Sequence, residues 1–357
     1  MSDEMDIGVL AESFTEYLST EWPREKAVAY ARSGATHADA LWSETAALGW
    51  PALTIAEAHG GLGLGTNALA ALHEALGAAA APLPMLGTNL AAALIAHSGS
   101  DPQQAHLLPG LADGSERAAF AHPDAAVLDA NGAAVSGVVA DLLDAPSATL
   151  LFLRAVRGDN PVWLALPAAA PGIAIARVAL ADTTRSLGTV TLTDVTLDES
   201  AILTPANAAA LDDELLRLAA LALAADALGG GNAVLAATVE YMKIREQFGR
   251  VIGSFQALKH RAADHKATLE SARELVDHAA SLAADAPDAL LAALTAKQHL
   301  TRVTAEVARD CIQLHGGVGF TSEYVPHVYL KRAKLNEVLF GTRSALLDRI
   351  ADMLEAA

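Results

Sequence analysis

The order in which helical and strand patterns follow one another constrains the fold of this 357-residue chain more than any single motif. Residues 5–114 follow the helical period, and the chain is helical again from residue 212 to its end. Between them, apolar runs alternate with turns rich in glycine, proline, asparagine and aspartate; the runs cover residues 135–139, 148–154, 161–166, 172–177 and 188–193. Such short strands indicate a small β-barrel or sandwich. The order therefore predicts an α+β fold that is mostly α.

Three domains are predicted from this order: an N-terminal helical domain over 1–116, a central β domain over 117–205 and a C-terminal helix bundle over 206–357. In the bundle, a long helix is expected to end at Phe248. Four further helices are expected over residues 254–284, 287–315, 326–338 and 342–354.

The last strand-like run contains a break in its alternation. Val190 and Leu192 share one face of a strand, whereas Val195 falls on the other face. One extra residue in the strand restores the register. We therefore expect a β-bulge near Asp194.

Composition and charge argue against several classes of partner. The formal net charge of −18 argues against binding to nucleic acid or to anionic membrane surfaces. The most apolar run, residues 215–228, contains Arg217 and Asp226 and is interpreted as a buried bundle helix, so no membrane partner is predicted. Cys311 is the only cysteine, which excludes an internal disulfide and fits a reducing cytoplasm. The acidic start of the chain argues against a secretory or mitochondrial leader.

The strongest functional pattern lies two-thirds of the way along the chain. We interpret it as the end of one helix, with Gly249 in the left-handed position after it, and the start of another with Ser254 as N-cap. Arg245 and Phe248 then share a face of the first helix, and Gln256 lies in the first turn of the second. A cation, a ring, an amide and a helix N-terminus suit a ligand that carries phosphate and a ring system. Taken alone, the pattern also fits a helix corner with one solvated arginine.

The same pattern resembles the signature R-x-x-F-G-x-x-I-x-x-F-Q of the acyl-CoA dehydrogenase family. The order of helices, strands and helices is also that of the acyl-CoA dehydrogenase fold, and the resemblance covers nearly the whole chain. In that family the arginine and the glutamine reach the FAD of a neighbouring subunit. The resemblance implies that Arg245, Gln247, Phe248 and Gln256 bind FAD.

A second glycine-rich segment follows a predicted helix end. Its sequence resembles the family signature Q-x-x-G-G-x-G-[YF] and reads Gln313-Leu-His315-Gly316-Gly317-Val-Gly319-Phe320. Consecutive glycines allow the backbone to approach a ligand closely, although two glycines alone also fit a simple helix stop. The resemblance implies that Gln313, Gly316 and Gly317 contact the adenosine side of FAD, and that His315 also binds the cofactor. No metal ligands are assigned.

The chain departs from the family at the catalytic base. By resemblance, Gly341 and Thr342 lie against the flavin, and the residue before them is the glutamate that takes a proton from Cα of the acyl-CoA. Here that residue is Phe340, which has no group that accepts a proton. Some members carry the base near the start of the long helix, at a position close to Ala219 in this chain.

Three carboxylates lie near these two positions. They are interpreted as surface or capping charges, and Glu337 is the best candidate for a displaced base; the others are Glu214 and Asp226. The two flavin-facing segments of the family also differ here, since the chain has residues 120–124 and 138–141 in their place. The catalytic residue is therefore unassigned.

The segments that face the flavin differ from the family, whereas the segments that reach a neighbour's cofactor match it. This combination resembles members of the family that act as one partner in an α2β2 assembly. The leading hypothesis is FAD-dependent α,β-dehydrogenation of an acyl-CoA, with this chain as the partner that lacks the base. The alternatives are a self-sufficient homotetramer with a displaced base and a non-catalytic scaffold. The expected partners are an acyl-CoA substrate, a second acyl-CoA dehydrogenase subunit or a second copy of this chain, and an electron-transferring flavoprotein. A cytoplasmic location is expected, and the acyl group stays open, with a bulky or sterol-derived chain as one option.

Overall fold

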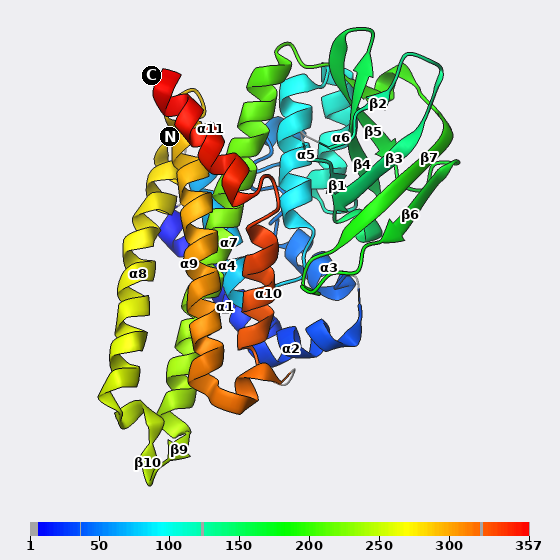
Figure 1. Cartoon of the computed structure of the whole chain (residues 1–357). Helices are drawn as coiled ribbons and strands as arrows, with labels where there is room; N and C mark the ends of the chain where they lie inside the picture. Colours follow the sequence, from blue (N-terminus) through cyan, green and yellow to red (C-terminus); the bar gives the residue numbers. More distant parts are fainter. Residues whose placement is uncertain (1–5, 36, 123–124, 322–323, 357) are drawn as a thin grey trace. The chain divides into compact units, whose positions relative to one another are not determined.

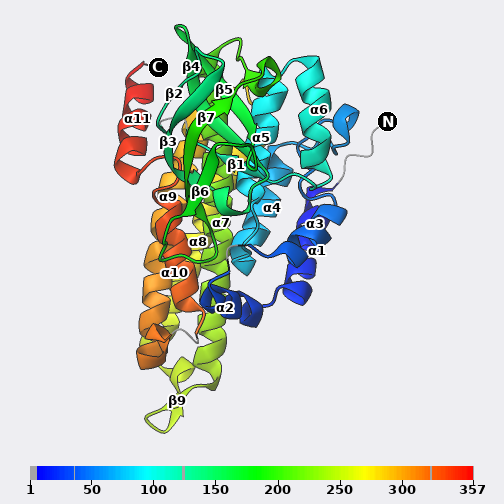
Figure 2. The same cartoon turned by 90° about the vertical axis from the view of Figure 1, so that its right-hand side faces the viewer.

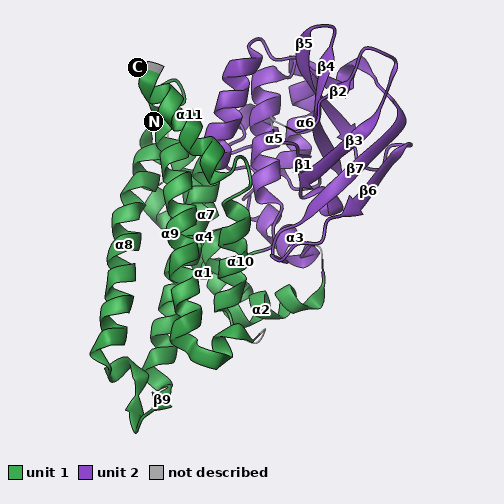
Figure 3. Ribbon diagram, viewed as in Figure 1, with its two compact units in different colours: residues 1–34, 66–81, 220–357 green, residues 35–65, 82–219 purple. Residues whose placement is uncertain are grey.

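The structure is a computed structural model that describes residues 6–35, 37–122, 125–321 and 324–356. The chain divides into two compact units, which are coloured separately in Figure 3. The bundle unit comprises residues 1–34, 66–81 and 220–357, and the sheet unit comprises residues 35–65 and 82–219. Each unit combines segments that are distant in the sequence. The three predicted domains instead divide the chain by the type of its elements, and that division remains a prediction.

Helices make up almost all of the bundle unit (Figure 1). They are α1 (Ile7–Glu21), α2 (Arg24–Ser33), α4 (Thr66–Ala79), most of α7 (Ala208–Ile244), α8 (Gln256–Ser281), α9 (Ala289–His315), α10 (Pro326–Asn336) and α11 (Arg343–Ala356). Helix α9 packs against both α8 and α10, and α9 and α10 lie side by side in the turned view of Figure 2 as well. The four bundle helices after α7 begin and end within three residues of their predicted bounds.

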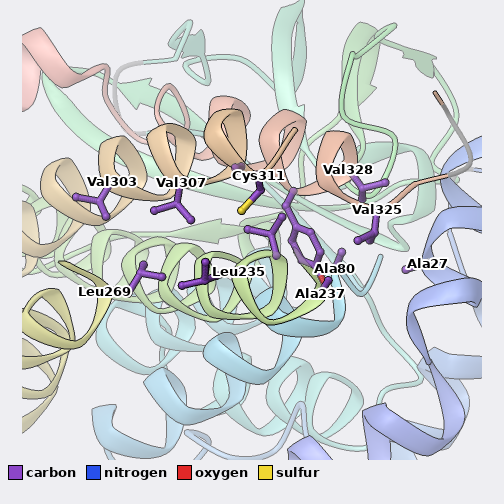
Figure 4. Close-up of a cluster of buried hydrophobic side chains, with 13 residues drawn as sticks. Ala27, Ala80, Leu235, Ala237, Leu269, Val303, Val307, Cys311, Val325 and Val328 are labelled. Carbon is purple, nitrogen blue, oxygen red and sulfur yellow. The ribbon is translucent and has the colours of Figure 1, made fainter. Parts of the chain in front are cut away.

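Apolar side chains from α7, α8, α9 and α10 fill the core of the bundle unit (Figure 4). Leu235, Leu269 and Val307 are each at most 4% exposed there, and Cys311 is fully buried. Burial raises the pKa of the Cys311 thiol to about 11, so the thiol stays protonated at neutral pH. This core fixes the direction of α9 and hence the position of the residues at both of its ends.

Helix α7 is long and apolar enough to cross a membrane by length and composition alone. However, 83% of its most apolar window is buried within the protein, as is common for the core helix of a folded unit. Arg217 and Asp226 in this run each have an ion-pair partner on the protein. The prediction of a buried bundle helix is therefore confirmed.

The sheet unit combines three helices with a mixed sheet. The helices are α3 (Asp39–Ala47), α5 (Met85–Ser98) and α6 (Asp101–Ala112). Among the described residues the sheet has eight strands, in the order β6-β7-β3-β1-β4-β5-β8, with β2 paired to β4. Their bounds are β1 (Ala118–Phe120), β2 (Leu128–Asp129), β3 (Ala134–Leu143), β4 (Leu150–Arg157), β5 (Asn160–Pro167), β6 (Ile173–Arg177), β7 (Leu187–Thr196) and β8 (Ile202–Leu203). All five predicted strands are present, and the three short ones, β1, β2 and β8, were missed.

The predicted bulge lies in β7. The pairing with β3 shifts between Val135 and Gly137, opposite Asp194, whose φ is 49°. The Asp194 amide donates to the hydroxyl oxygen of Ser136 over 2.8 Å, so the extra residue retains a hydrogen bond. Val195 is buried together with Leu192, which confirms that the bulge restores the apolar face.

The predicted helix corner after α7 was wrong. Helix α7 ends at Ile244, and the chain then forms a hairpin of β9 (Glu246–Gln247) and β10 (Arg250–Val251). Phe248 and Gly249 connect the strands at φ values of 55° and 77°. Two successive positive φ values are those of a type I′ turn, whose twist matches a two-residue hairpin. Arg245 and Phe248 therefore do not share a helix face.

The predicted N-cap of α8 was also wrong. The Ser254 hydroxyl donates to the carbonyl oxygen of Val251 over 2.7 Å, and Phe255 occupies the N-cap position without a side-chain hydrogen bond. The short 3-10 turn at residues 252–254 uses this hydroxyl to close the link from the hairpin. Gln256 begins α8, so its predicted place in the first turn is confirmed.

Candidate functional site

A pocket of about 700 Å³ opens in the bundle unit between the hairpin and the C-terminal end of α9. We call it the hairpin pocket. Seven of the residues predicted to bind the cofactor line it: Arg245, Gln247, Phe248, Gln313, His315, Gly316 and Gly317. The two sequence signatures, which are separated by more than fifty residues, therefore meet at one pocket. Figure 1 shows the reason, since α8 leads away from the hairpin and α9 returns beside it.

The other two predicted residues lie outside the lining. Gln256 is exposed at the start of α8, and its neighbours Ala257 and Leu258 line the pocket instead. Thr342 directly precedes α11, beside the part of α9 that contains Lys297. Lys297 and Gln313 are sixteen residues apart on α9, which corresponds to about 24 Å along the helix. Thr342 therefore belongs to a second region of the bundle unit.

Arg245 supplies a positive charge that the described part of the protein does not neutralise. Its backbone is fixed because its amide donates to Tyr241 over 2.9 Å and its carbonyl accepts from Ile252 over 2.7 Å. Its side chain is exposed, and no ion pair to it is found among the described residues. A guanidinium held at a pocket in this way is suited to a phosphate or a carboxylate.

The glycine segment forms an open wall of the pocket. Helix α9 ends at His315, and Gly316, whose φ is 64°, begins a short 3-10 turn. A Cβ atom placed on Gly316 or Gly317 meets no protein atom within 4 Å. By contrast, a Cβ on Gly319 would lie 2.4 Å from the carbonyl oxygen of Ile312. The backbone of the first two glycines is thus accessible to a ligand, while the third glycine is required by packing.

His315 and Tyr241 form the aromatic part of the lining. Their ring centroids are 4.4 Å apart and the planes are inclined by 18°, which is a stacked arrangement. Nδ1 of His315 donates to the carbonyl oxygen of Cys311 over 2.8 Å, so Nε2 is the unprotonated nitrogen in the neutral ring. Burial lowers the pKa of His315, although the bond to Cys311 partly opposes the shift. The ring is therefore neutral at physiological pH.

The sequence interpretation missed Arg261, a second cation in the lining. It extends from α8 and forms a bidentate ion pair with Asp310 of α9, which also accepts a hydrogen bond from His265 over 2.7 Å. Burial opposes ionisation of Asp310, but the bonds from Arg261 and His265 outweigh it and lower the pKa. The spacing of Arg261 and His265, one turn apart, was the available signal for a shared helix face.

Phe340 occupies the position predicted for the base. It is 4% exposed and has a φ of 53°, which is uncommon for a bulky residue. Glu337, the weak alternative, ends α10 and pairs with Lys334 over 2.7 Å. Glu214 pairs with Arg217 over 2.6 Å, and Ala219 is fully buried. Each of these glutamates is thus engaged by a neighbouring cation.

The interpretation of Asp226 as a surface or capping charge was wrong. Its side chain is 1% exposed, and it pairs with Arg332 over 2.6 Å. Asn336 donates to the same carboxylate over 2.7 Å. These partners come from α10 and compensate for the loss of water around the charge.

The first of the altered flavin-facing segments includes residues 123 and 124, which lie outside the described residues. In the second segment, Asp141 has a φ of 54° within β3.

Two family models match most of the chain. They describe the C-terminal domain of acyl-CoA dehydrogenase, over residues 210–355, and its N-terminal domain, over residues 8–115. The acyl-CoA dehydrogenase IpdE2 of Mycobacterium tuberculosis is 36% identical over 304 residues, which cover 85% of this chain and 82% of that protein. The acyl-CoA dehydrogenase FadE34 of the same organism is 30% identical, and the match covers 88% of this chain but 42% of the longer protein.

Solved structures give the same result for the fold. A variant of the Tcur3481-Tcur3483 steroid acyl-CoA dehydrogenase has a TM-score of 0.84 at 31% identity, covering 98% of this chain and 97% of that one. The ChsE4-ChsE5 complex of M. tuberculosis has a TM-score of 0.87 at 25% identity, and the match covers 100% of this chain and 98% of that one. Butyryl-CoA dehydrogenase of Megasphaera elsdenii reaches 0.90 at 22% identity, covering 99% and 100%, which shows the shared fold.

Proposed function

Because the chain belongs to the acyl-CoA dehydrogenase family, whose members oxidise acyl-CoA thioesters with FAD, we propose that it is the partner subunit of a two-chain enzyme and lacks the catalytic base. The single observation that carries this proposal is the buried Phe340 at the position of the base. A phenyl ring accepts no proton, and the three candidate carboxylates, those of Glu214, Asp226 and Glu337, are all engaged by cations. The base then comes from another chain.

The hairpin pocket fits the adenosine and diphosphate part of FAD. Arg245 has no ion-pair partner among the described residues, the backbone of Gly316 and Gly317 is open, and the Tyr241–His315 stack offers a flat surface to a ring. When bound, FAD supplies the acceptor for the hydride from Cβ of the acyl chain. Arg245 would hold the diphosphate, and Arg261, oriented and largely neutralised by Asp310, lines the same pocket.

The separation of the two regions supports a cofactor shared between chains. The hairpin pocket lies at the C-terminal end of α9, whereas Thr342 lies near Lys297, about 24 Å away along the helix. In our proposal the pocket holds a flavin whose ring lies mainly in the partner. Two structural relatives, the ChsE4-ChsE5 complex and Tcur3481-Tcur3483, each pair two proteins, and we extend that pairing to this chain.

The test is co-purification with a second acyl-CoA dehydrogenase chain from the same source. We expect this chain alone to be colourless, and the complex to contain one FAD for each pair of unlike chains and to oxidise an acyl-CoA. If the isolated chain is yellow, holds one FAD per chain and oxidises an acyl-CoA, the proposal is wrong and a self-sufficient homotetramer is supported. If the complex forms but contains no FAD, the chain is a scaffold.

The remaining partners belong to the same proposal. We propose an electron-transferring flavoprotein as the electron acceptor and the cytoplasm as the location. A structure described as an electron-transferring flavoprotein of Acidaminococcus fermentans aligns with a TM-score of 0.84 at 25% identity. Because the structural relative Tcur3481-Tcur3483 is a steroid acyl-CoA dehydrogenase, a sterol-derived acyl-CoA is the first substrate to test.

A further inference from the structure

Lys297 is a fully buried lysine of α9 that the proposed cofactor contacts do not use. Its Nζ atom donates a hydrogen bond to the carbonyl oxygen of Gly341 over 2.7 Å. Within the described ranges of the chain, this carbonyl is the hydrogen-bond partner of Nζ, and no acidic side chain pairs with it. A buried lysine without a carboxylate is unusual, because lysine is almost never fully buried unless it is paired.

Burial makes this arrangement unfavourable for the charged form. Desolvation lowers the pKa of Lys297 to about 7 from its ordinary value of 10.5. A methionine of similar length would fill the same space without this cost. The amine therefore contributes something that an apolar side chain does not, and the only interaction that it makes in the described structure is the bond to Gly341. Both protonation states of the amine retain N–H donors.

The carbonyl that Lys297 holds belongs to a turn with two successive positive φ values. Phe340 has a φ of 53° and Gly341 has a φ of 104°. Such a backbone persists for a bulky residue only when the surrounding structure fixes it. The hydrogen bond from α9 supplies that constraint from outside the turn.

The turn also sets the start of α11. Directly after it, the Thr342 side chain accepts a hydrogen bond from the Ala345 amide over 3.4 Å, and its carbonyl accepts from the Leu346 amide over 3.0 Å. Thr342 therefore caps the terminal helix. A rotation of the Gly341 peptide would move Thr342 and the first turn of α11 together.

We propose that Lys297 is a positioning residue that holds the Phe340–Gly341 turn through the Gly341 carbonyl and thereby sets where Thr342 faces the cofactor. The second half of this inference depends on the proposed function, because Thr342 is the residue expected beside the flavin. The first half, that Lys297 fixes the turn, concerns this chain alone. Lys297 touches no substrate in this arrangement and acts through the turn.

The experiment compares Lys297→Met with Leu300→Met, a substitution at a fully buried residue of the same helix that leaves the donor in place. Amide exchange of residues 343–346 is measured in each full chain. FAD release and the visible flavin spectrum are then measured in the complex with the partner. We expect exchange at the start of α11 to be about tenfold faster in Lys297→Met only, since loss of one hydrogen bond from the amine to the turn is worth about that factor. FAD release, which this bond affects only through the turn, should also be faster in Lys297→Met only.

Lys297→Arg, which retains N–H donors, should restore most of the protection and the flavin spectrum. If Lys297→Met does not fold, the same two measurements on Lys297→Gln decide the question, because its amide is a shorter donor and should give an intermediate result. Unchanged exchange at residues 343–346 overturns the inference. Faster exchange with an unaltered flavin overturns its second half. A wild-type complex that binds no FAD refutes the proposed function, and the exchange result still decides the role of Lys297.

Discussion

Arg332 and Asp226 form an ion pair inside the bundle unit, with 4% and 1% of their side chains exposed and a shortest distance of 2.6 Å. Their sequence separation is 106 residues, and Asn336 donates to the same carboxylate over 2.7 Å. The pair joins α10 to α7, and α10 leads to the Phe340 turn. This network therefore connects the core of the bundle to the segment where the family has its base.

Replacing Asp226 with Asn should destabilise the protein strongly. The substitution removes the carboxylate that pairs with the buried Arg332 charge, which costs about 3–5 kcal/mol in the free energy of unfolding. Urea unfolding of the complex measures the loss. Asp352→Asn, at an exposed position of α11, is the control and should change stability by less than about 0.5 kcal/mol. Equal effects of the two substitutions would contradict the assignment.

Replacing Arg245 with Ala should remove FAD from the complex without unfolding it. A charge-assisted bond to a diphosphate is worth about 1.5–3 kcal/mol, so retention of FAD should fall about tenfold to a hundredfold. Flavin absorbance after gel filtration measures retention. Arg309→Ala, an exposed arginine of α9 outside the pocket lining, should have no effect. A complex that keeps its flavin in Arg245→Ala would show that the pocket does not bind the diphosphate.

The glycine wall offers a matched pair of substitutions. A Cβ atom on Gly317 meets no protein atom within 4 Å, so Gly317→Val should fold but obstruct the backbone surface proposed for FAD. On Gly319, by contrast, a Cβ would lie 2.4 Å from the Ile312 carbonyl, so Gly319→Val should destabilise the fold by about 1–3 kcal/mol. Thermal unfolding and flavin content, measured together, separate the two effects. Normal flavin content in Gly317→Val would rule out cofactor contact at this wall.

Replacing Glu337 with Gln tests the displaced-base alternative. The side chain is held by Lys334 and is 21% exposed, so we expect acyl-CoA oxidation by the complex to be unchanged and stability to fall by no more than about 1 kcal/mol. Turnover under saturating acyl-CoA is the measurement. A loss of several orders of magnitude in kcat would instead identify Glu337 as the base.

Lys297 should make stability depend on pH in the alkaline range. Its pKa is about 7 in the folded state and near 10.5 when unfolded, so between these values the unfolded chain binds the additional proton. The unfolding free energy should therefore rise as pH increases from about 7 to about 10, by up to about 1.4 kcal/mol per pH unit, and level off below pH 7. Chemical denaturation at several pH values gives the slope. Lys297→Met should lack this contribution to the pH dependence. If the wild-type protein and Lys297→Met show the same slope of unfolding free energy against pH, the lysine is solvated.

Sequence reasoning succeeded where the signal was local. The alternation of Val190, Leu192 and Val195 predicted a bulge at Asp194 because side chains on a strand alternate with a fixed period of two. The helices after the hairpin were found because their apolar period continues over several turns. Both glycine-containing signatures were recognised by their resemblance to the family, and residues of both line the hairpin pocket.

The errors arose where the outcome depends on distant partners or on backbone angles. The sequence around Phe248 and Gly249 is compatible with a helix end, and only the pairing of β9 with β10 makes it a hairpin. Asp226 looks like an exposed charge until Arg332 is brought to it from 106 residues away. Arg261 gave no signal of its own, because it reaches the pocket through the packing of α8 on α9.

The sequence by itself determined the succession of helices, strands and helices, the family and the loss of a carboxylate at Phe340, because these depend on residue types in order. Only the tertiary structure decided that Arg245, Gln313 and the open glycines line one pocket, and that Lys297 reaches the Gly341 turn. Contacts of this kind depend on how helices pack, and packing is set by all of the buried side chains together.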